Sequence, residues 1–446
     1  MTFINMKFLP NIIFLIILSA GLSLFVFNIK KVINNIKLGK DIDRFDKKKE
    51  RWKNMALLAL GQSKMIQRPV SGVLHIIVYV GFILINIELL EITIDGLLGT
   101  HRVFAPYLGG FYNVLIGTFE ILAFLVFVSV VIFWIRRNLM KLKRFIQPEM
   151  KGWPKNDADF ILYFEIILMF LFLSMNATDV LLQDLNTPDY IKAGSYPVSV
   201  FLHPLYENFS QSNLIVLERI FWWFHIIGIL IFANYLYYSK HLHILLAFPN
   251  TFFANLDSKG RFKNNPNVTK EVKLMMDPNN DPFASSQSES IPEKFGVSDV
   301  IDMNWVQLLN AYTCTECGRC TSECPANQTG KKLSPRKIMM DTRDRLVEVG
   351  HNYRKNKEKF VPDGKELLND YISPEELWAC TSCNACVEAC PIGIDPLSII
   401  MDMRQYLVME KSSAPGDLNN MMSNIENNGA PWPFNKQDRL LWANEN

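Results

Sequence analysis

The sequence has no cysteine in its first 313 residues, and all eight cysteines lie between Cys314 and Cys390. It also lacks a nicotinamide-binding fingerprint and any pattern typical of an activated nucleophile. The charge is nearly balanced, with 46 Lys and Arg against 44 Asp and Glu, and gives no indication of a nucleic-acid partner. These absences leave two informative features, which are the crowded cysteines and a set of long apolar stretches in the first half.

The cysteines form two runs with identical spacing. They are Cys314-x-x-Cys317-x-x-Cys320-x-x-x-Cys324-Pro325 and Cys380-x-x-Cys383-x-x-Cys386-x-x-x-Cys390-Pro391. This spacing is typical of two-cluster ferredoxins, in which the fourth cysteine of each run ligates the cluster of the other run. We therefore predict one [4Fe–4S] cluster on Cys314, Cys317, Cys320 and Cys390, and a second on Cys380, Cys383, Cys386 and Cys324.

Zinc and disulfides are the alternatives for these cysteines. Zinc sites use pairs of Cys-x-x-Cys, whereas these runs are trios followed by Cys-Pro. A disulfide framework is unusual on the cytosolic side of a membrane, where the loop charges place this domain. The spacing favours iron–sulfur clusters and leaves both alternatives open.

Five stretches in the first half are long and apolar enough to span a bilayer, which takes about 20 helical residues. The first is not typical of a signal peptide, because only Lys7 precedes it and no small-residue cleavage site follows it. The five stretches are 8–27, 70–94, 111–135, 160–182 and 220–238.

We expect a mostly α protein, a five-helix transmembrane bundle followed by a cytosolic α-helical two-cluster ferredoxin-like domain. Within the second domain, Ser334-Pro335 and Ser373-Pro374 are typical helix starts, and the first of these helices should run to about Val349. The segment around Asp277–Pro282 is typical of a linker, and the Asn-rich tail is expected to be loop-like. The expected parts are a membrane domain (1–249), a linker (250–300), a cluster domain (301–410) and a partner-docking tail (411–446).

The basic residues predict the orientation in the membrane. Twelve Lys and Arg lie between the first and second stretches and seven between the third and fourth, against only Arg102, Lys192 and Arg219 in the other two loops. Because basic loops stay on the cytoplasmic side, the N-terminus is expected outside and the cysteine domain in the cytosol. The chain is thus predicted to be a multi-pass protein of the cytoplasmic membrane.

Histidines are candidate haem ligands in the bundle, because an ionisable residue inside a membrane is usually functional. His225 and His243 are 18 residues apart, which is five turns if the fifth helix continues past its apolar part. His75, one turn into the second helix, would lie level with His243, and this pair is predicted to hold an inner b haem. His225 would serve a second haem with His101, or with His203 in reserve. The alternative is that these histidines are interfacial or hydrogen-bonded within the bundle.

Carboxylates gather in the outer half of the bundle. Glu88, Glu91, Glu120 and Asp179 share that depth, and acids at one depth can line a proton path. Since a quinone exchanges protons together with electrons, we predict a quinone pocket near His101, Glu120 and Asp179. The alternative is that these side chains reach the interface or cap helix ends.

Both halves resemble known families. The membrane half is similar to the cytochrome b gamma subunit of respiratory nitrate reductase and to membrane subunits of heterodisulfide-reductase-like complexes. In the nitrate reductase subunit, helices 2 and 5 each supply two haem ligands; His75, His225 and His243 match three of them, and the second ligand on helix 2 is missing here. The cysteine half resembles the C subunit of heterodisulfide reductase, including Cys317-Gly318 and Ser334-Pro335-Arg336.

The resemblance implies an electron-transfer subunit that relays electrons between menaquinone and a cytosolic redox partner. It implies one or two b haems, two [4Fe–4S] clusters, and a partner that is a CCG-domain iron–sulfur subunit or electron-transfer flavoprotein. Since all eight cysteines are assigned, a separate subunit is expected to supply the CCG domain. The alternative function is a membrane-anchored iron–sulfur redox sensor or docking module without haem.

Overall fold

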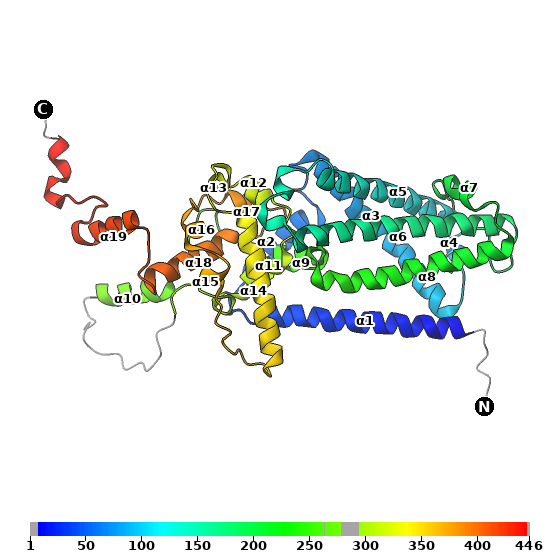
Figure 1. Ribbon diagram of the computed structural model, residues 1–446, viewed down its shortest axis with the longest axis horizontal. Helices are drawn as coiled ribbons and strands as arrows, with labels where there is room; N and C mark the ends of the chain where they lie inside the picture. Colours follow the sequence, from blue (N-terminus) through cyan, green and yellow to red (C-terminus); the bar gives the residue numbers. More distant parts are fainter. Residues whose placement is uncertain (1–7, 263, 278–293, 444–446) are drawn as a thin grey trace.

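The computed structural model describes residues 8–262, 264–277 and 294–443, and the molecule is elongated (Figure 1). Among these residues helices dominate and no strand occurs. Five long helices lie side by side in one half of the molecule, and a compact helical domain caps one end of them. The long helices are α1 (Leu9–Ile36), α3 (Pro69–Leu98), α5 (Gly110–Asn138), α6 (Trp153–Asp184) and α8 (Gln211–Tyr235).

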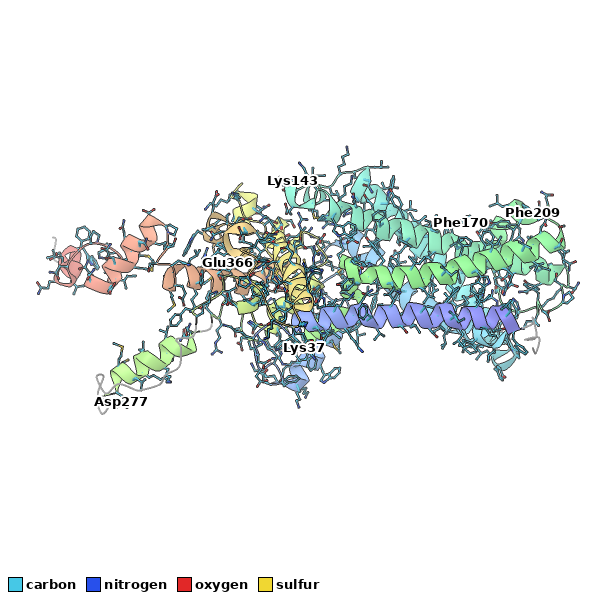
Figure 2. The ribbon with its side chains drawn as sticks, turned by 60° about the horizontal axis from the view of Figure 1, so that its bottom comes forward. Lys37, Lys143, Phe170, Phe209, Asp277 and Glu366 are labelled. Atoms are coloured by element: carbon cyan, nitrogen blue, oxygen red, sulfur yellow. The ribbon has the colours of Figure 1, made fainter. Side chains whose placement is uncertain are left out.

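These helices confirm the predicted five-helix bundle, and each is long and apolar enough to cross a membrane. They are longer than the apolar stretches, because their polar ends find protein partners. At the end of α1, for example, Asn35 Nδ2 donates to the Tyr312 hydroxyl of the second domain at 2.6 Å. Figure 2 shows Lys37 and Lys143, from the two basic segments, at the end of the bundle that meets the second domain, with Phe209 at the opposite end.

The fifth helix does not continue to His243, so the expectation of five unbroken turns from His225 is wrong. After α8 a short 3-10 turn reaches Tyr238, Ser239 is extended (φ −111°, ψ 147°), and α9 (His243–Phe252) begins anew. The buried carboxylate of Asp157 explains the break, because it accepts from the Tyr235 hydroxyl at 2.7 Å and from the Lys240 backbone N–H at 3.1 Å. The break, rather than helical periodicity, therefore positions His243.

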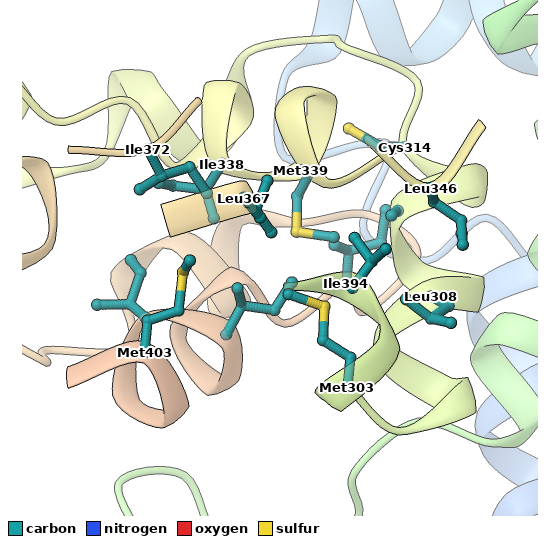
Figure 3. Packing of buried hydrophobic residues seen from close by; sticks show 14 of the residues in the cluster. Met303, Leu308, Cys314, Ile338, Met339, Leu346, Leu367, Ile372, Ile394 and Met403 are labelled. Carbon is teal, nitrogen blue, oxygen red and sulfur yellow. The ribbon is translucent and has the colours of Figure 1, made fainter. Parts of the chain in front are cut away.

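The second domain is built around a single apolar core (Figure 3). Ile338, Leu346 and Met403 are among its fully buried side chains, each of which contributes about 1.5–3 kcal/mol by leaving water. Val32 of α1 and Leu242 belong to the same core, so the domain packs directly on the end of the bundle. Its helices include α11 (Trp305–Thr313), α14 (Pro335–Lys355), α16 (Pro374–Trp378), α17 (Ala385–Ala389) and α18 (Pro396–Met409).

Both predicted helix starts are confirmed. Ser334 caps α14 with Pro335 at its first position, and Ser373 forms a capping box with Glu376 at the start of α16. The helix α14 continues past Val349 to Lys355, because its last turns still pack against the end of α1, where Arg354 donates to Asn35.

The segments expected to be linker and tail are partly helical. Helix α10 (Pro266–Met276) lies within the expected linker, Val297 and Val300 already belong to the domain core, and most of the predicted Asp277–Pro282 break lies outside the described residues. The tail forms α19 (Gly416–Asn428) rather than a loop, since Leu418, Met421 and Ile425 recur at helical spacing. Docking of a partner by this tail stays a prediction.

Candidate functional site

The two cysteine runs fold into the same loop. The second residue after the first cysteine has a left-handed backbone in both runs (Glu316, φ 54°; Ser382, φ 52°). So does the fourth residue (Gly318, φ 72°; Asn384, φ 61°). Left-handed φ is rare for residues other than glycine, and its repetition at matching positions identifies a shared loop geometry. Gly318 is doubly constrained, because a Cβ there would lie 2.5 Å from Arg336 Nη1.

The folding of the runs brings the last cysteine of each beside the other run. A cavity is lined by Cys314, Cys317, Cys320 and Cys390, and Cys386 of the second set borders it. Cys380 and Cys386 both lie within electrostatic range of Cys324. The first site therefore contains the four residues of one predicted set and lies beside Cys386 of the other set, while the ligand assignment of both sets stays a prediction.

The surroundings of these thiols fit a positively charged cofactor. Burial raises the pKa of Cys314 to about 12 and that of Cys390 to about 11. Thiols buried to this degree ionise readily only beside a positive group, which cluster iron provides. Backbone N–H groups already aim at the sulfurs, from Ile394 to Cys390 at 3.3 Å and from Ser382 to Cys380 at 3.4 Å.

The first cysteine run faces the bundle. Arg319 donates to the backbone oxygens of Lys64 and Met65 at 2.9 and 3.3 Å, just before α3 begins. Arg68, also ahead of α3, donates to Ser322 at 2.6 Å. In the second run, by contrast, Cys383 is exposed. One site therefore lies against the membrane half, and the other opens toward solvent.

Two histidines meet where the first run touches the bundle. The rings of His75 and His243 lie 6.5 Å apart, centroid to centroid, with their planes inclined by 39°. The Nδ1 of His243 is 3.0 Å from the Lys240 carbonyl oxygen, which leaves Nε2 available, and the buried Nδ1 of His75 has no hydrogen-bond partner. Burial lowers the pKa of His243, so its ring is neutral and able to ligate a metal.

His225, on α8, lies deeper in the bundle and packs against α6. It is buried, its Nδ1 is 3.1 Å from the Leu168 carbonyl oxygen, and its ring lies beside Phe172. In the described part of the chain, no ring contact joins His225 to His101 or His203. The structure thus brings His75 and His243 together but not His225 with either candidate partner.

His101 takes part in a buried charged network at the far end of the bundle. Its Nε2 lies 3.2 Å from Asp179 Oδ1, and Arg102 donates to the other oxygen of Asp179 at 2.9 Å and to Glu88 at 2.8 Å. Buried charges are tolerated only when paired in this way. The role of Arg102 was not predicted from the sequence. The one indication there is that Arg102 is among the three basic residues in the loops after the second and fourth apolar stretches.

A cavity of about 430 Å³ opens beside this network, a size typical of ligand sites. Its lining includes His101, Asp179 and Trp222, contributed by the loop after α3 and by α6 and α8. Glu120, predicted to join them, is absent from the lining, because its carboxylate accepts from the Val198 and Ser199 backbone N–H groups at 2.9 and 3.0 Å. Glu120 therefore fixes a loop behind the cavity.

A bundle of membrane-length helices joined to a domain with two interleaved cysteine loops defines an iron–sulfur membrane protein. The family model described as a 4Fe–4S dicluster domain matches residues 313–394. This match accounts for both cysteine runs and establishes the iron–sulfur character of the domain.

Relatives match nearly the whole chain. The chain is 29% identical to the probable iron-sulfur-binding oxidoreductase FadF of Bacillus subtilis, over 97% of this chain and 61% of that protein. It is 26% identical to the EtfAB:quinone oxidoreductase of Syntrophomonas wolfei, over 96% of this chain and 59% of that protein. The chain thus spans about three fifths of the length of these two relatives.

The cysteine half also matches the C subunit of a CoB-CoM heterodisulfide reductase from Methanosarcina acetivorans, at 33% identity over 24% of this chain and 52% of that protein. This match confirms the resemblance predicted from the cysteine runs. No solved structure matches the chain. Together the similarities support an electron-transfer role.

Proposed function

We propose that the chain relays electrons between a membrane quinone, menaquinone in the first instance, and a redox partner on the cytosolic side. The observation that carries this proposal is the His75–His243 pair, which lies at the junction of the bundle and the first cysteine site. A pair of neighbouring imidazoles there would connect membrane chemistry with cluster chemistry in one chain. The name of the Syntrophomonas relative, an EtfAB:quinone oxidoreductase, supports the same class of reaction.

The eight cysteines supply the ligands for two [4Fe–4S] clusters, which accept and release single electrons. Cys314, Cys317, Cys320 and Cys390 hold the cluster near the bundle. Cys380, Cys383, Cys386 and Cys324 hold the other, which opens toward solvent through the exposed Cys383. The loops carry backbone N–H donors to Cys380 and Cys390.

His75 and His243 are the residues proposed to hold a b haem. Their ring centroids lie 6.5 Å apart, so both imidazoles would be able to hold one haem iron between them, and the haem would supply one-electron transfer there. The contact from His243 Nδ1 to the Lys240 carbonyl is the outer hydrogen bond that orients most metal-bound histidines. His225 has an equivalent contact to Leu168 and would serve a second haem.

The cavity beside His101 is the proposed quinone pocket. His101 is held by Asp179 through Nε2, while its Nδ1 is buried without a hydrogen-bond partner and is free to exchange a proton with a quinone oxygen. Arg102 pairs with Asp179 and so fixes the carboxylate that holds the imidazole in place. Because Nε2 is engaged, we assign His101 to the quinone rather than to the haem of His225.

The partner is proposed to be a CCG-domain iron–sulfur subunit or an electron-transfer flavoprotein, which would approach the exposed second site. The proposed orientation, which the distribution of basic residues among the loops favours, would have this site in the cytosol and the quinone pocket toward the outer face. The names of the relatives, among them EtfAB and heterodisulfide reductase subunits, support both partner classes.

A membrane-anchored redox sensor without haem is the second candidate function. It is favoured by a match to a probable membrane-anchored ferredoxin of Chromohalobacter salexigens, 32% identical over 33% of this chain and 24% of that protein. The two functions differ in whether a quinol can deliver electrons to the clusters.

The test is an anaerobic titration of the purified protein with a soluble menaquinol analogue. Visible spectra follow haem reduction and electron paramagnetic resonance follows the clusters, with dithionite as the control that reduces both. If the chain is a relay, the menaquinol analogue should reduce the same fraction of the haem as dithionite does. Clusters that respond to dithionite in a protein without a quinol-reducible haem would favour the sensor.

A further inference from the structure

Lys240 joins the turn that carries His243 to the first cysteine loop. Its carbonyl oxygen lies 3.0 Å from His243 Nδ1, and its ammonium group pairs with the carboxylate of Glu316. Nζ also donates to the Pro154 carbonyl at 2.6 Å, and the whole side chain is nearly buried. Lys240 therefore touches the proposed haem-ligand turn with its backbone and the cluster loop with its charge.

Glu316 extends this connection to a sulfur. It stands between Cys314 and Cys317, is only 3% exposed, and pairs on its other side with Arg343 at 2.7 Å. Its backbone N–H donates to the Cys314 thiol. One buried ion pair therefore links the turn that carries His243 to the loop that carries Cys314.

The second cysteine run provides an internal comparison. Ser382 occupies the position equivalent to Glu316, with nearly the same φ and the same backbone contact to a cysteine. Its side chain carries no charge and merely donates to the Thr381 carbonyl in an exposed position. The loop geometry therefore does not require a carboxylate, and the buried Lys240–Glu316 pair is specific to the loop that faces the bundle.

We propose that Lys240 and Glu316 are positioning residues that fix the cluster loop to the His243 turn and set the reduction potential of the first cluster apart from that of the second. This inference rests on the proposed function in one respect, the assignment of a cluster to the first site. A buried charge beside a cluster acts in a low-dielectric region, where it shifts potentials more than a solvated charge does.

The direction in which each substitution shifts the reduction potential of the first cluster follows from the charge that the substitution removes. Replacing Lys240 with Met leaves the Glu316 carboxylate less compensated, which disfavours an added electron and lowers the potential of the first cluster. Replacing Glu316 with Gln removes the carboxylate that Lys240 and Arg343 share, although Asp157 and Asp344 stay beside them, and the loss of this negative charge raises the potential of the first cluster. The double variant removes both charges and returns the potential toward the original value.

The experiment is a redox titration of the full chain in detergent, followed by electron paramagnetic resonance, for K240M, E316Q, K240R and the double variant. We expect opposite shifts in the two single variants, each at least tenfold in the reduction equilibrium, or about 59 mV for one electron. The second cluster should not move, and K240R should retain the original potential. K294M is the matched control, because Lys294 pairs with Asp302 away from both cysteine runs.

Iron and haem contents are measured on every variant, so that a folding defect is distinguished from a shift in potential. Unchanged potentials in K240M and E316Q, or equal shifts of both clusters, would overturn the inference while leaving the relay intact. If K240M does not fold, the E316Q and K240R variants provide the test. A potential of the first cluster that is not raised in E316Q would contradict the proposal. Absence of any cluster in the unmodified protein would instead refute the proposed function.

Discussion

The ring centroids of His75 and His243 lie 6.5 Å apart, although His75 lies in the second turn of a membrane helix and His243 follows a break after the last one. Arg319, between two cysteines of the first run, donates to the segment directly ahead of the helix that carries His75. The imidazole pair and the first cysteine site are thus held by the same few residues. This proximity is the structural basis of the proposed relay.

If each cluster is ligated by cysteines from both runs, the effect of each cysteine substitution on the two clusters can be predicted. Cys390 belongs to the second run but lines the cavity of the first. We expect C390S to remove the same paramagnetic signal as C317S and to leave the signal that C383S removes. Iron analysis and electron paramagnetic resonance of the three variants check this. If C390S and C383S lost the same signal, each run would bind its own cluster.

The two proposed roles of His101 predict different losses. As a quinone-pocket residue, His101 should leave the haem content unchanged when replaced by Gln, while quinol oxidation slows by roughly 10²- to 10⁴-fold, the range typical of a lost acid–base group. Haem quantitation together with stopped-flow reduction by a menaquinol analogue separates the two. Loss of a haem in H101Q would assign the residue to the iron of His225 instead.

The loop charges predict the sidedness of the bundle. Alkaline phosphatase, which is active only outside the cytoplasm, should be active when fused after Asp189 and inactive when fused after Lys143, since basic segments stay inside. The two fusions control for each other, because they differ by a single span and should therefore report opposite sides. Activity at Lys143 alone would invert the topology and place the clusters outside.

A buried ion network predicts the stability of the cluster domain. Arg345 is fully buried and pairs with Asp299 at 2.7 Å and Asp363 at 2.6 Å. R345A leaves Asp299 buried without its cation, which should lower the free energy of unfolding by about 3–5 kcal/mol. Urea unfolding followed by cluster absorbance measures this, with K332M, from the exposed Lys332–Glu375 pair, as a control that should change little. Equal stabilities would show that Asp299 finds another partner.

Much of the architecture could be predicted from the sequence, because its signals are local. Five apolar stretches suffice for the bundle, and Ser334-Pro335 and Ser373-Pro374 start helices by local capping chemistry. The tail helix α19 was not predicted, because its many asparagines favour a loop and the helical spacing of Leu418, Met421 and Ile425 was given less weight.

The parts that escaped prediction depend on distant partners. Nothing near Ser239 in the sequence breaks a helix, and the break forms because Asp157, on another helix, binds both sides of it. The Lys240–Glu316 pair likewise joins segments that meet only in the folded chain. Glu120 looked equivalent to Asp179 by depth, and only the position of the loop at Ser199 separates their roles.

Haem content tests the central claim most directly. We would record a reduced-minus-oxidised visible spectrum and quantify haem and iron on the purified protein, on H75A and H243A, and on H351A, whose histidine is exposed and serves as the control. We predict at least one b haem per chain, its loss in H75A and H243A with cluster iron retained, and no change in H351A. A protein with full cluster iron and no haem, or with the same haem in H75A, would contradict the relay and favour the anchored sensor.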